Sequence, residues 1–167
     1  LSDIVIFNSC TVTAESERKI CQMIRRVKRE NSGCITVLTG CIPQAFPSEL
    51  KKFDDIDIII GNSNKPEIVE IIENFILKKN KIIDVPEYKN ENLLNKLSIS
   101  KFGSHSRAFV KIEDGCNRFC SYCIIPYSRG RVKSKSLSDI KEEVSRLAMN
   151  GYKEVVLVGI NLSCYGT

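Results

Sequence analysis

The sequence has no tryptophan, a single histidine, and no apolar run long enough to cross a bilayer. Nothing in it resembles a secretory leader, an internal repeat or a low-complexity tract. No serine-, histidine- or carboxylate-based catalytic constellation stands out either. With 43% hydrophobic and 27% charged residues among its 167, the composition is that of a globular protein.

What the sequence does contain is cysteine, with eight residues against the one histidine. Because no export signal is seen, this content favours metal ligands or reactive thiols over disulfides. The chain opens on Leu1 rather than methionine and stops at Thr167, in an expected loop just after a strand. We therefore expect an internal fragment of a longer protein.

The first half of the chain predicts alternating strands and helices. Short β-branched runs predict buried parallel strands at 4–7, 34–38 and 56–60. Apolar residues at helical spacing predict a helix over 14–30, capped by Thr11 or Thr13, a short helix at 48–53, and another that Pro66 opens. This order predicts a three-layer α/β unit with a parallel sheet.

The second half begins after a polar stretch without periodicity, which we interpret as a linker over 81–106. A strand is expected at 108–112, a helix at 137–149 and a strand at 154–159. Ser136, with Asp139 three residues on, resembles a helix start. This β-loop-α-β order suits the start of a β/α barrel, where active sites lie at the carboxyl ends of strands.

The net charge of +5 belongs to the second half, since residues 1–80 carry 11 basic and 11 acidic side chains. Between Cys116 and Lys135 there are five basic residues and no acidic one: Arg118, Arg129, Arg131, Lys133 and Lys135. The segment is either a solvated basic loop or a contact for phosphate or nucleic acid beside a cysteine site.

The strongest motif is three cysteines within eight residues, Cys116, Cys120 and Cys123, directly after an expected strand. A tight loop can turn the three thiolates toward one metal centre. Zinc would need a fourth ligand, and the candidates Cys164 and His105 lack ligand spacing. An iron–sulfur cube fits better, because three cysteines leave one iron open for a substrate. A zinc knob and buried, unliganded thiols are the alternatives.

Two further cysteines follow neighbouring strands, Cys10 after the first and Cys41 after the second. In a parallel sheet both lie at the same edge, so they can converge although they are far apart in sequence. Two cysteines alone make a poor site. We interpret Cys21 and Cys34 as core residues and Cys164 as an incidental thiol.

The string from Phe109 to Arg131, FVKIEDGCNRFCSYCIIPYSRGR, resembles the methylthiotransferase branch of the radical S-adenosylmethionine (SAM) enzymes. In that family the three cysteines bind a 4Fe–4S cluster whose open iron chelates SAM, and one electron splits SAM to give a 5′-deoxyadenosyl radical. The resemblance implies this role for Cys116, Cys120 and Cys123. It also implies that Tyr122, just before the last cysteine, lies near the SAM adenine.

The same resemblance implies a second 4Fe–4S cluster, which members of the family hold with three cysteines of an N-terminal domain. Cys10 and Cys41 match the second and third of those ligands, and the first would lie upstream of Leu1. The domains so implied are an N-terminal methylthiotransferase domain over 1–80 without its first strand and first cysteine, a linker over 81–106, and the truncated start of a radical SAM barrel over 107–167.

Three branches of the family act on different targets, and the strings Asn8–Thr13 and Val158–Gly166 look most like the branch acting on threonylcarbamoyladenosine in tRNA. Asn161 stands where that branch often has histidine. The resemblance thus implies methylthio transfer to carbon 2 of that nucleoside next to the anticodon, in a reducing cytosol, with an external one-electron donor and no membrane.

The alternatives are the branches acting on isopentenyladenosine in tRNA or on a ribosomal-protein aspartate. A different class is a non-enzymatic zinc module that binds nucleic acid. We expect the fragment by itself to be inactive.

Overall fold

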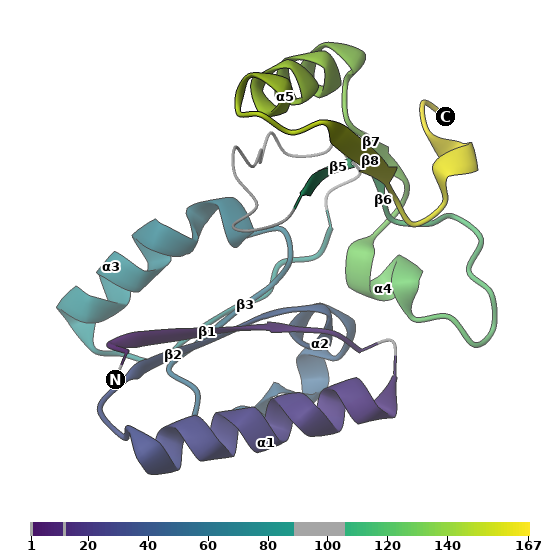
Figure 1. The fold of residues 1–167 in the computed structure, drawn as a ribbon. Coiled ribbons are helices and arrows are strands. Elements are labelled where there is room, and N and C mark those ends of the chain that lie inside the picture. The colour runs from purple at the N-terminus through teal and green to yellow at the C-terminus, as the bar shows by residue number, and fades with distance from the viewer. Residues whose placement is uncertain (1, 12, 89–105) are drawn as a thin grey trace. The chain divides into compact units, whose positions relative to one another are not determined.

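A computed structural model of the chain describes residues 2–11, 13–88 and 106–167 (Figure 1). The chain divides into two compact units. The N-terminal unit comprises Leu1–Tyr88 with Cys120–Arg129, and the C-terminal unit comprises Lys89–Phe119 with Gly130–Thr167. The boundary therefore falls inside the three-cysteine motif.

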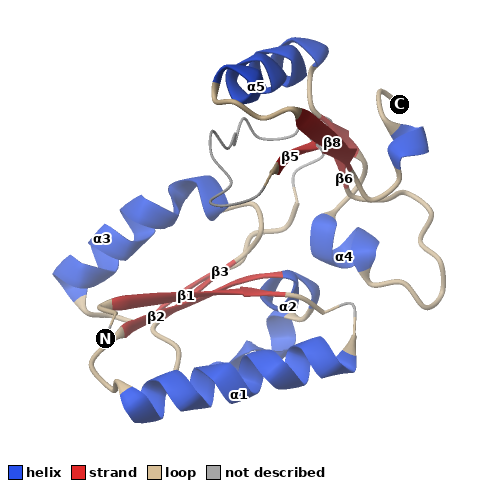
Figure 2. Cartoon of the chain, in the orientation of Figure 1, coloured by secondary structure: helices blue, strands red, loops and turns tan. Residues whose placement is uncertain are grey.

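The N-terminal unit is a parallel sheet with helices on both faces (Figures 1 and 2). Its strands pair in the order β1-β2-β3-β4, all parallel. The expected three-layer α/β architecture is confirmed. The elements are β1 (Ile4–Ser9), α1 (Ala14–Glu30), β2 (Ile35–Gly40), α2 (Cys41–Ala45), η1 (Pro47–Phe53), β3 (Ile58–Ile60), η2 (Lys65–Glu67), α3 (Ile68–Lys78), β4 (Ile82–Asp84) and α4 (Ile125–Arg129).

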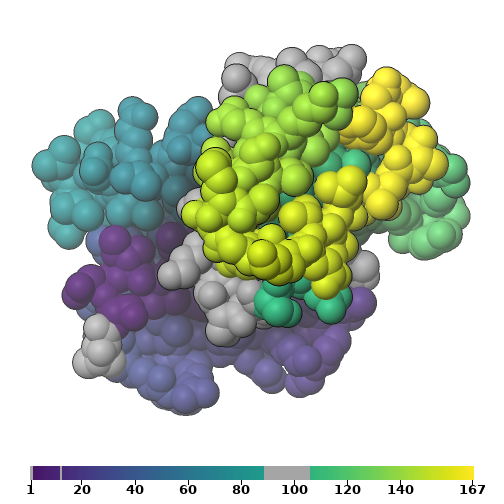
Figure 3. All heavy atoms as spheres, turned by 45° about the horizontal axis from the view of Figure 1, so that its top comes forward, coloured from purple at the N-terminus to yellow at the C-terminus, as the bar shows by residue number. Residues whose placement is uncertain are grey.

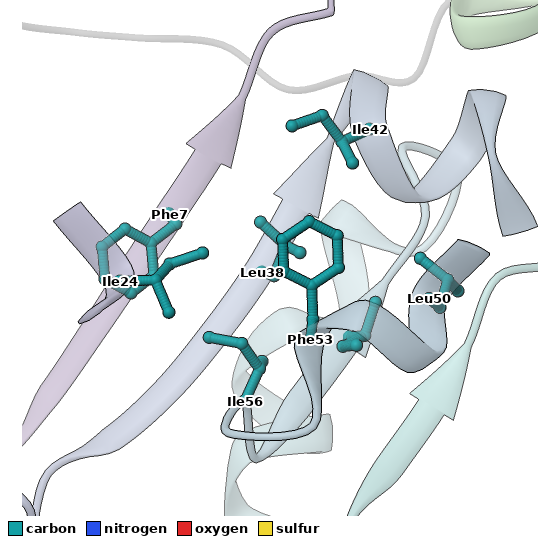
Figure 4. Packing of buried hydrophobic residues seen from close by; sticks show 8 residues of the cluster. Phe7, Ile24, Leu38, Ile42, Leu50, Phe53 and Ile56 are labelled. Atoms are coloured by element: carbon teal, nitrogen blue, oxygen red, sulfur yellow. The ribbon is translucent and has the colours of Figure 1, made fainter. Parts of the chain in front are cut away.

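Helix α1 begins where the sequence predicts, because Thr13 is its N-cap and accepts a hydrogen bond from the backbone N–H of Ser16. Its apolar stripe covers one face of the sheet. There, Ile24 packs with Phe7 of β1 and Leu38 of β2 in a buried cluster (Figure 4). Burial of this stripe, more than helix propensity, holds a helix of this length in place.

The other face of the sheet is covered by α3, whose Ile72 and Phe75 pack on Val37, Ile58 and Ile60. Strand β4 extends the sheet beside β3, with Ile82 opposite Ile58. Residues 82–84 of β4 fall within the linker predicted over 81–106, so the predicted start of the linker is wrong. Most of the remaining linker, 89–105, lies outside the described residues.

The C-terminal unit is built on a parallel pair of strands, β5 (Arg107–Lys111) and β8 (Glu154–Val158), joined through α5 (Leu137–Met149). The Ser136 side chain caps α5 by accepting from the backbone N–H of Asp139, as predicted. Apolar residues of β5 and α5 form its core, and α5 lies at the surface of this unit (Figure 3). The other elements are β6 (Glu113–Asp114), which pairs antiparallel with β7 (Lys133–Ser134), and η3 (Leu162–Cys164).

None of the described helices combines the length and apolar character needed to span a membrane.

Asp57 ties three elements of the N-terminal unit together ahead of β3. Its carboxylate accepts hydrogen bonds from the backbone N–H and the hydroxyl of Thr36, both at 2.8 Å, and from Lys28 of α1 at 3.0 Å. Partial burial would raise the pKa of this carboxyl, but the Thr36 and Lys28 hydrogen bonds outweigh that effect and hold the pKa below its usual value.

Asp57→Asn should lower the free energy of unfolding most at neutral pH. Because the folded-state pKa lies below that of the unfolded chain, the stabilisation is complete above the unfolded pKa of about 4 and is lost as the pH falls through the folded pKa. Urea denaturation should show that the difference in free energy of unfolding between the unaltered protein and D57N becomes smaller from about pH 7 to about pH 3. Asp54→Asn, at a side chain 87% exposed, is the matched control and should show a small gap at both pH values.

Candidate functional site

The carboxyl edge of the N-terminal sheet brings two of the predicted site residues to neighbouring positions. Strands β1 and β2 run parallel in a register that ends with Ser9 opposite Gly40. Cys10 and Cys41 are the next residues of the two strands, so the prediction that both lie at one edge is confirmed. Cys10 is exposed, whereas Cys41 is 1% exposed at the start of α2.

Ser9 organises this edge through its buried side chain. The hydroxyl donates to the Thr39 carbonyl at 2.6 Å and accepts from the backbone N–H of Ile42 at 3.1 Å. The second bond satisfies an N–H in the first turn of α2 that has no partner within the helix. Ser9 therefore fixes the turn that carries Cys41.

Gly40 is required in this turn for two reasons. Its φ of 103° lies in the left-handed region that side chains disfavour. A Cβ at this position would also stand 2.3 Å from the carbonyl oxygen of Ser9. The close approach of the two strand ends depends on the absence of a side chain here.

A similar constraint shapes the turn in the C-terminal unit where the three-cysteine loop begins, directly after β6. Gly115 has φ 89°, and a Cβ there would stand 2.1 Å from the Arg131 carbonyl oxygen. The backbone N–H of Cys116 donates to the Gly130 carbonyl, and that of Val132 donates to the Asn117 side chain, both at 3.1 Å. The first cysteine of the motif is thus anchored on both sides.

Phe119, just before the second cysteine, has a left-handed φ of 46°. This conformation is unusual for a bulky residue and indicates a backbone held by its surroundings. The Arg131 guanidinium lies 5.5 Å from the centre of the Phe119 ring, within the range of a cation–π contact. After it, the backbone N–H of Cys123 donates to the Cys120 carbonyl at 2.9 Å, which closes a turn between the last two cysteines.

The cysteines of this loop reach solvent to different degrees, because Cys120 is exposed while Cys116 and Cys123 are half-buried. Across residues 2–11, 13–88 and 106–167, no group of three or more histidine, cysteine, aspartate or glutamate side chains is gathered closely enough to hold a metal ion. Cys116 belongs to the C-terminal unit, and Cys120 and Cys123 belong to the N-terminal unit. As a donor set they still fit an iron–sulfur cluster, since all three are thiols without a nearby fourth ligand in sequence.

The other residues singled out from the sequence differ in how far they are exposed to solvent. Tyr122 is 90% exposed, and its expected contact with SAM stays a prediction. Cys34 is buried, as expected of a core residue, and Cys21 is half-buried against the core of the N-terminal unit. Cys164 is half-buried and its sulfur accepts a hydrogen bond from the Asn161 side chain at 3.1 Å. His105 lies outside the described residues.

Comparison with protein families matches both halves of the chain. Residues 1–61 match a family described as "Uncharacterized protein family UPF0004", and residues 110–166 match the radical SAM superfamily. Among curated proteins, the chain is 39% identical over 166 residues to a threonylcarbamoyladenosine tRNA methylthiotransferase, MtaB, of Aquifex aeolicus, covering 99% of this chain and 40% of that protein.

It is also 33% identical to the protein of that name in Bacillus subtilis, over 99% of this chain and 37% of the relative. A tRNA-2-methylthio-N(6)-dimethylallyladenosine synthase of Clostridium novyi is 38% identical, with the same coverage. Along nearly its whole length, the chain is similar to radical SAM methylthiotransferases. It spans about two fifths of the length of the curated relatives it matches.

Family similarity and packing divide the cysteine motif of this chain differently. All three cysteines lie in the stretch matched to the radical SAM superfamily. In the structure, however, Cys120 and Cys123 are grouped with the N-terminal unit and only Cys116 with the C-terminal unit. Helix α4, which follows the motif, packs on α2, the helix that begins at Cys41.

One of the five basic residues assigned to a possible phosphate contact has another role. Lys135 is only 5% exposed and its ammonium group lies 2.5 Å from the Glu143 carboxylate of α5, which is 4% exposed. Arg118 and Arg131 are exposed and Lys133 is half-buried. The basic surface of the loop is therefore smaller than the sequence indicates, because Lys135 is buried in an ion pair with Glu143.

Sequence reasoning missed two residues at the edges that carry the cysteines. Glu113 is fully buried directly before the motif, and its carboxylate accepts the backbone N–H of Asn161 at 2.8 Å. Asn62, after β3, donates to the Ser128 carbonyl at 2.7 Å. Asn62 could have been noticed as a polar residue just past a strand of the parallel sheet, but no signal indicated a buried carboxylate at 113.

Gly40→Ala should destabilise the protein by about 2 kcal/mol or more, because the new Cβ would meet the Ser9 backbone in a disfavoured φ region. Gly33→Ala is the matched control, since a methyl group at that position would have nothing within 4 Å of it. Its effect should stay within about 0.5 kcal/mol. Equal shifts of the denaturation midpoint in the two variants would contradict the close approach.

Lys135→Met should lower the free energy of unfolding by about 3–5 kcal/mol, because the buried Glu143 carboxylate loses its ion pair with the Lys135 ammonium group. The control is Arg146→Ala, which removes a pair on the same helix whose Glu142 carboxylate side chain is 74% exposed. That change should cost about 1 kcal/mol or less. Urea denaturation of both variants measures the difference, and a small loss in K135M would argue that the Lys135–Glu143 pair is open to solvent.

Proposed function

We propose that this chain is part of a tRNA methylthiotransferase that acts on carbon 2 of threonylcarbamoyladenosine next to the anticodon. The observation that carries the proposal is the presence of two separate thiol sets in one chain. One lies at the carboxyl edge of the N-terminal sheet and the other in the loop after β6. An enzyme that only cleaves SAM needs one set, whereas an enzyme that also transfers sulfur has use for a second.

The loop set comprises Cys116, Cys120 and Cys123, which would hold a 4Fe–4S cluster with one iron open to SAM. When bound, this cluster supplies the electron for cleavage of SAM. The chain's own part is to hold the loop, through the Gly115 turn and the hydrogen bond from Cys116 to Gly130. Tyr122, exposed beside the last cysteine, would cover the SAM adenine.

The edge set comprises Cys10 and Cys41, which would hold a second 4Fe–4S cluster together with a third ligand outside this sequence. Ser9 and Gly40 keep the two strand ends in contact, so the two thiols start from adjacent backbone positions. Thiolate ligands and oxygen-labile clusters favour a reducing compartment, the cytosol. An external one-electron donor would serve the loop cluster.

The tRNA substrate is supported by the names of the curated relatives and by the exposed basic residues of the loop, Arg118 and Arg131. Both could neutralise backbone phosphate. The relatives include enzymes named for threonylcarbamoyladenosine and for dimethylallyladenosine, so the latter nucleoside is the second candidate substrate.

Iron analysis of the full-length protein tests the two clusters. After anaerobic reconstitution with iron and sulfide, we expect about eight irons per chain, falling to about four in Cys120→Ala and, separately, in Cys41→Ala. Cys34→Ala, at a buried core thiol, is the control and should keep the full content. Tight stoichiometric zinc without iron uptake would instead indicate a zinc module.

Nucleoside mass spectrometry of tRNA from a deletion strain identifies the substrate. We expect loss of the methylthio group from threonylcarbamoyladenosine alone. Its loss from the dimethylallyl nucleoside would favour that branch, and unchanged levels of both would favour a ribosomal-protein aspartate.

A further inference from the structure

Helix α4 is held in the N-terminal unit by a carbonyl group with two donors. Ser128, near the end of α4, is fully buried. Its backbone oxygen accepts hydrogen bonds from the Asn62 side-chain amide and from the Tyr88 hydroxyl, each at 2.7 Å. Carbonyl groups in the last turn of a helix have no partner within the helix, so these two side chains supply what the helix lacks.

Asn62 is itself fixed by α2. Its backbone N–H donates to the Gln44 side-chain oxygen at 3.0 Å, and the Gln44 amide donates to the Pro86 carbonyl at 2.9 Å. Gly61 allows this packing, since a Cβ there would stand 2.5 Å from the same Gln44 oxygen. Hydrogen bonds thus join four segments: α2, the turn after β3, the stretch after β4, and α4.

The two ends of this network lie next to cysteines. Gln44 is three residues after Cys41 in α2, and α4 begins two residues after Cys123. A helix of five residues has no stability by itself, so the place of α4 depends on its contacts with the rest of the unit. The contacts given by α2, Asn62 and Tyr88 therefore determine where the end of the cysteine loop is held.

We propose that Asn62 and Tyr88 are positioning residues that hold the segment containing Cys120 and Cys123 to the sheet edge that carries Cys41. The proposal rests on the proposed function insofar as it assigns clusters to both cysteine sets. We call the two hydrogen bonds that Asn62 and Tyr88 donate to the Ser128 carbonyl the clamp. The clamp does not depend on the assignment of clusters, because both bonds are made by the protein itself. In the two-cluster enzyme, the clamp couples the geometry of one cluster to that of the other.

Hydrogen–deuterium exchange of the metal-free full-length protein tests the clamp directly. In Asn62→Ala and in Tyr88→Phe we expect the amides of Ile125 and of residues 127–129 to exchange about fivefold faster for each lost hydrogen bond. Tyr88→Phe keeps the ring. The Asn62 side-chain oxygen is buried without a hydrogen-bond partner among the described residues, so removing it leaves no donor without an acceptor.

Asn64→Ala is the matched control, since Asn64 lies in the same turn but donates to Asp84 at 2.8 Å and not to α4. Tyr165→Phe removes a comparable phenol bond in the C-terminal unit, to the Lys135 carbonyl at 2.9 Å. Neither should change exchange at 125–129. Unchanged exchange in both clamp variants would overturn the proposal.

Electron paramagnetic resonance of the reduced full-length protein tests the coupling. At equal iron content, the magnetic interaction between the two clusters should weaken in the Asn62→Ala, Tyr88→Phe double variant and persist in Asn64→Ala. Faster exchange with an unaltered interaction would overturn the coupling. If the unaltered protein bound a single cluster, the two-cluster function would fail, and the exchange experiment would still decide whether the clamp exists.

Discussion

The close approach of two strand ends is the constraint on which the N-terminal unit depends. Gly40 comes so near the Ser9 backbone that a single methyl group would not fit between them. The Ser9 hydroxyl then bridges the end of β2 to the first turn of α2. Strand pairing, the start of the helix and the adjacency of Cys10 and Cys41 all follow from this one contact, because each uses the same few backbone atoms.

The unit boundaries divide the chain differently from its family matches. A short helix that follows the radical SAM motif packs on α2 and takes its hydrogen bonds from Asn62 and Tyr88. Two of the three motif cysteines are therefore grouped with the sheet that carries the other cysteine pair. In a protein that uses both sets, two of the three loop ligands would belong to the packing unit that holds Cys10 and Cys41.

Much of this fold can be predicted from local sequence. The helices at Ala14–Glu30 and Leu137–Met149 have the expected bounds, because each combines a side-chain cap with a long apolar stripe. The parallel strands and the shared edge of Cys10 and Cys41 follow from the alternation of elements. The long helices are the easiest to predict, because a dozen or more residues contribute to each pattern.

The elements that sequence reasoning missed are short and owe their form to tertiary contacts. Helices α2 and α4 each have five residues, including a proline, and β4 has three residues in a polar stretch. The role of Lys135 was equally hidden, since nothing in a run of basic residues says which one faces a buried glutamate. Convergence of the three loop cysteines stays a prediction based on their spacing.

The unequal burial of the two edge cysteines bears on the order of assembly. Cys10 is exposed to solvent, while Cys41, in the first turn of α2, is buried. If Cys41 is a metal ligand, as we propose, the metal must reach it before that turn closes or when the turn opens, so loading there would be tied to folding. Cys120 is exposed, so the proposed iron ligand there would be accessible in a chain that has already folded.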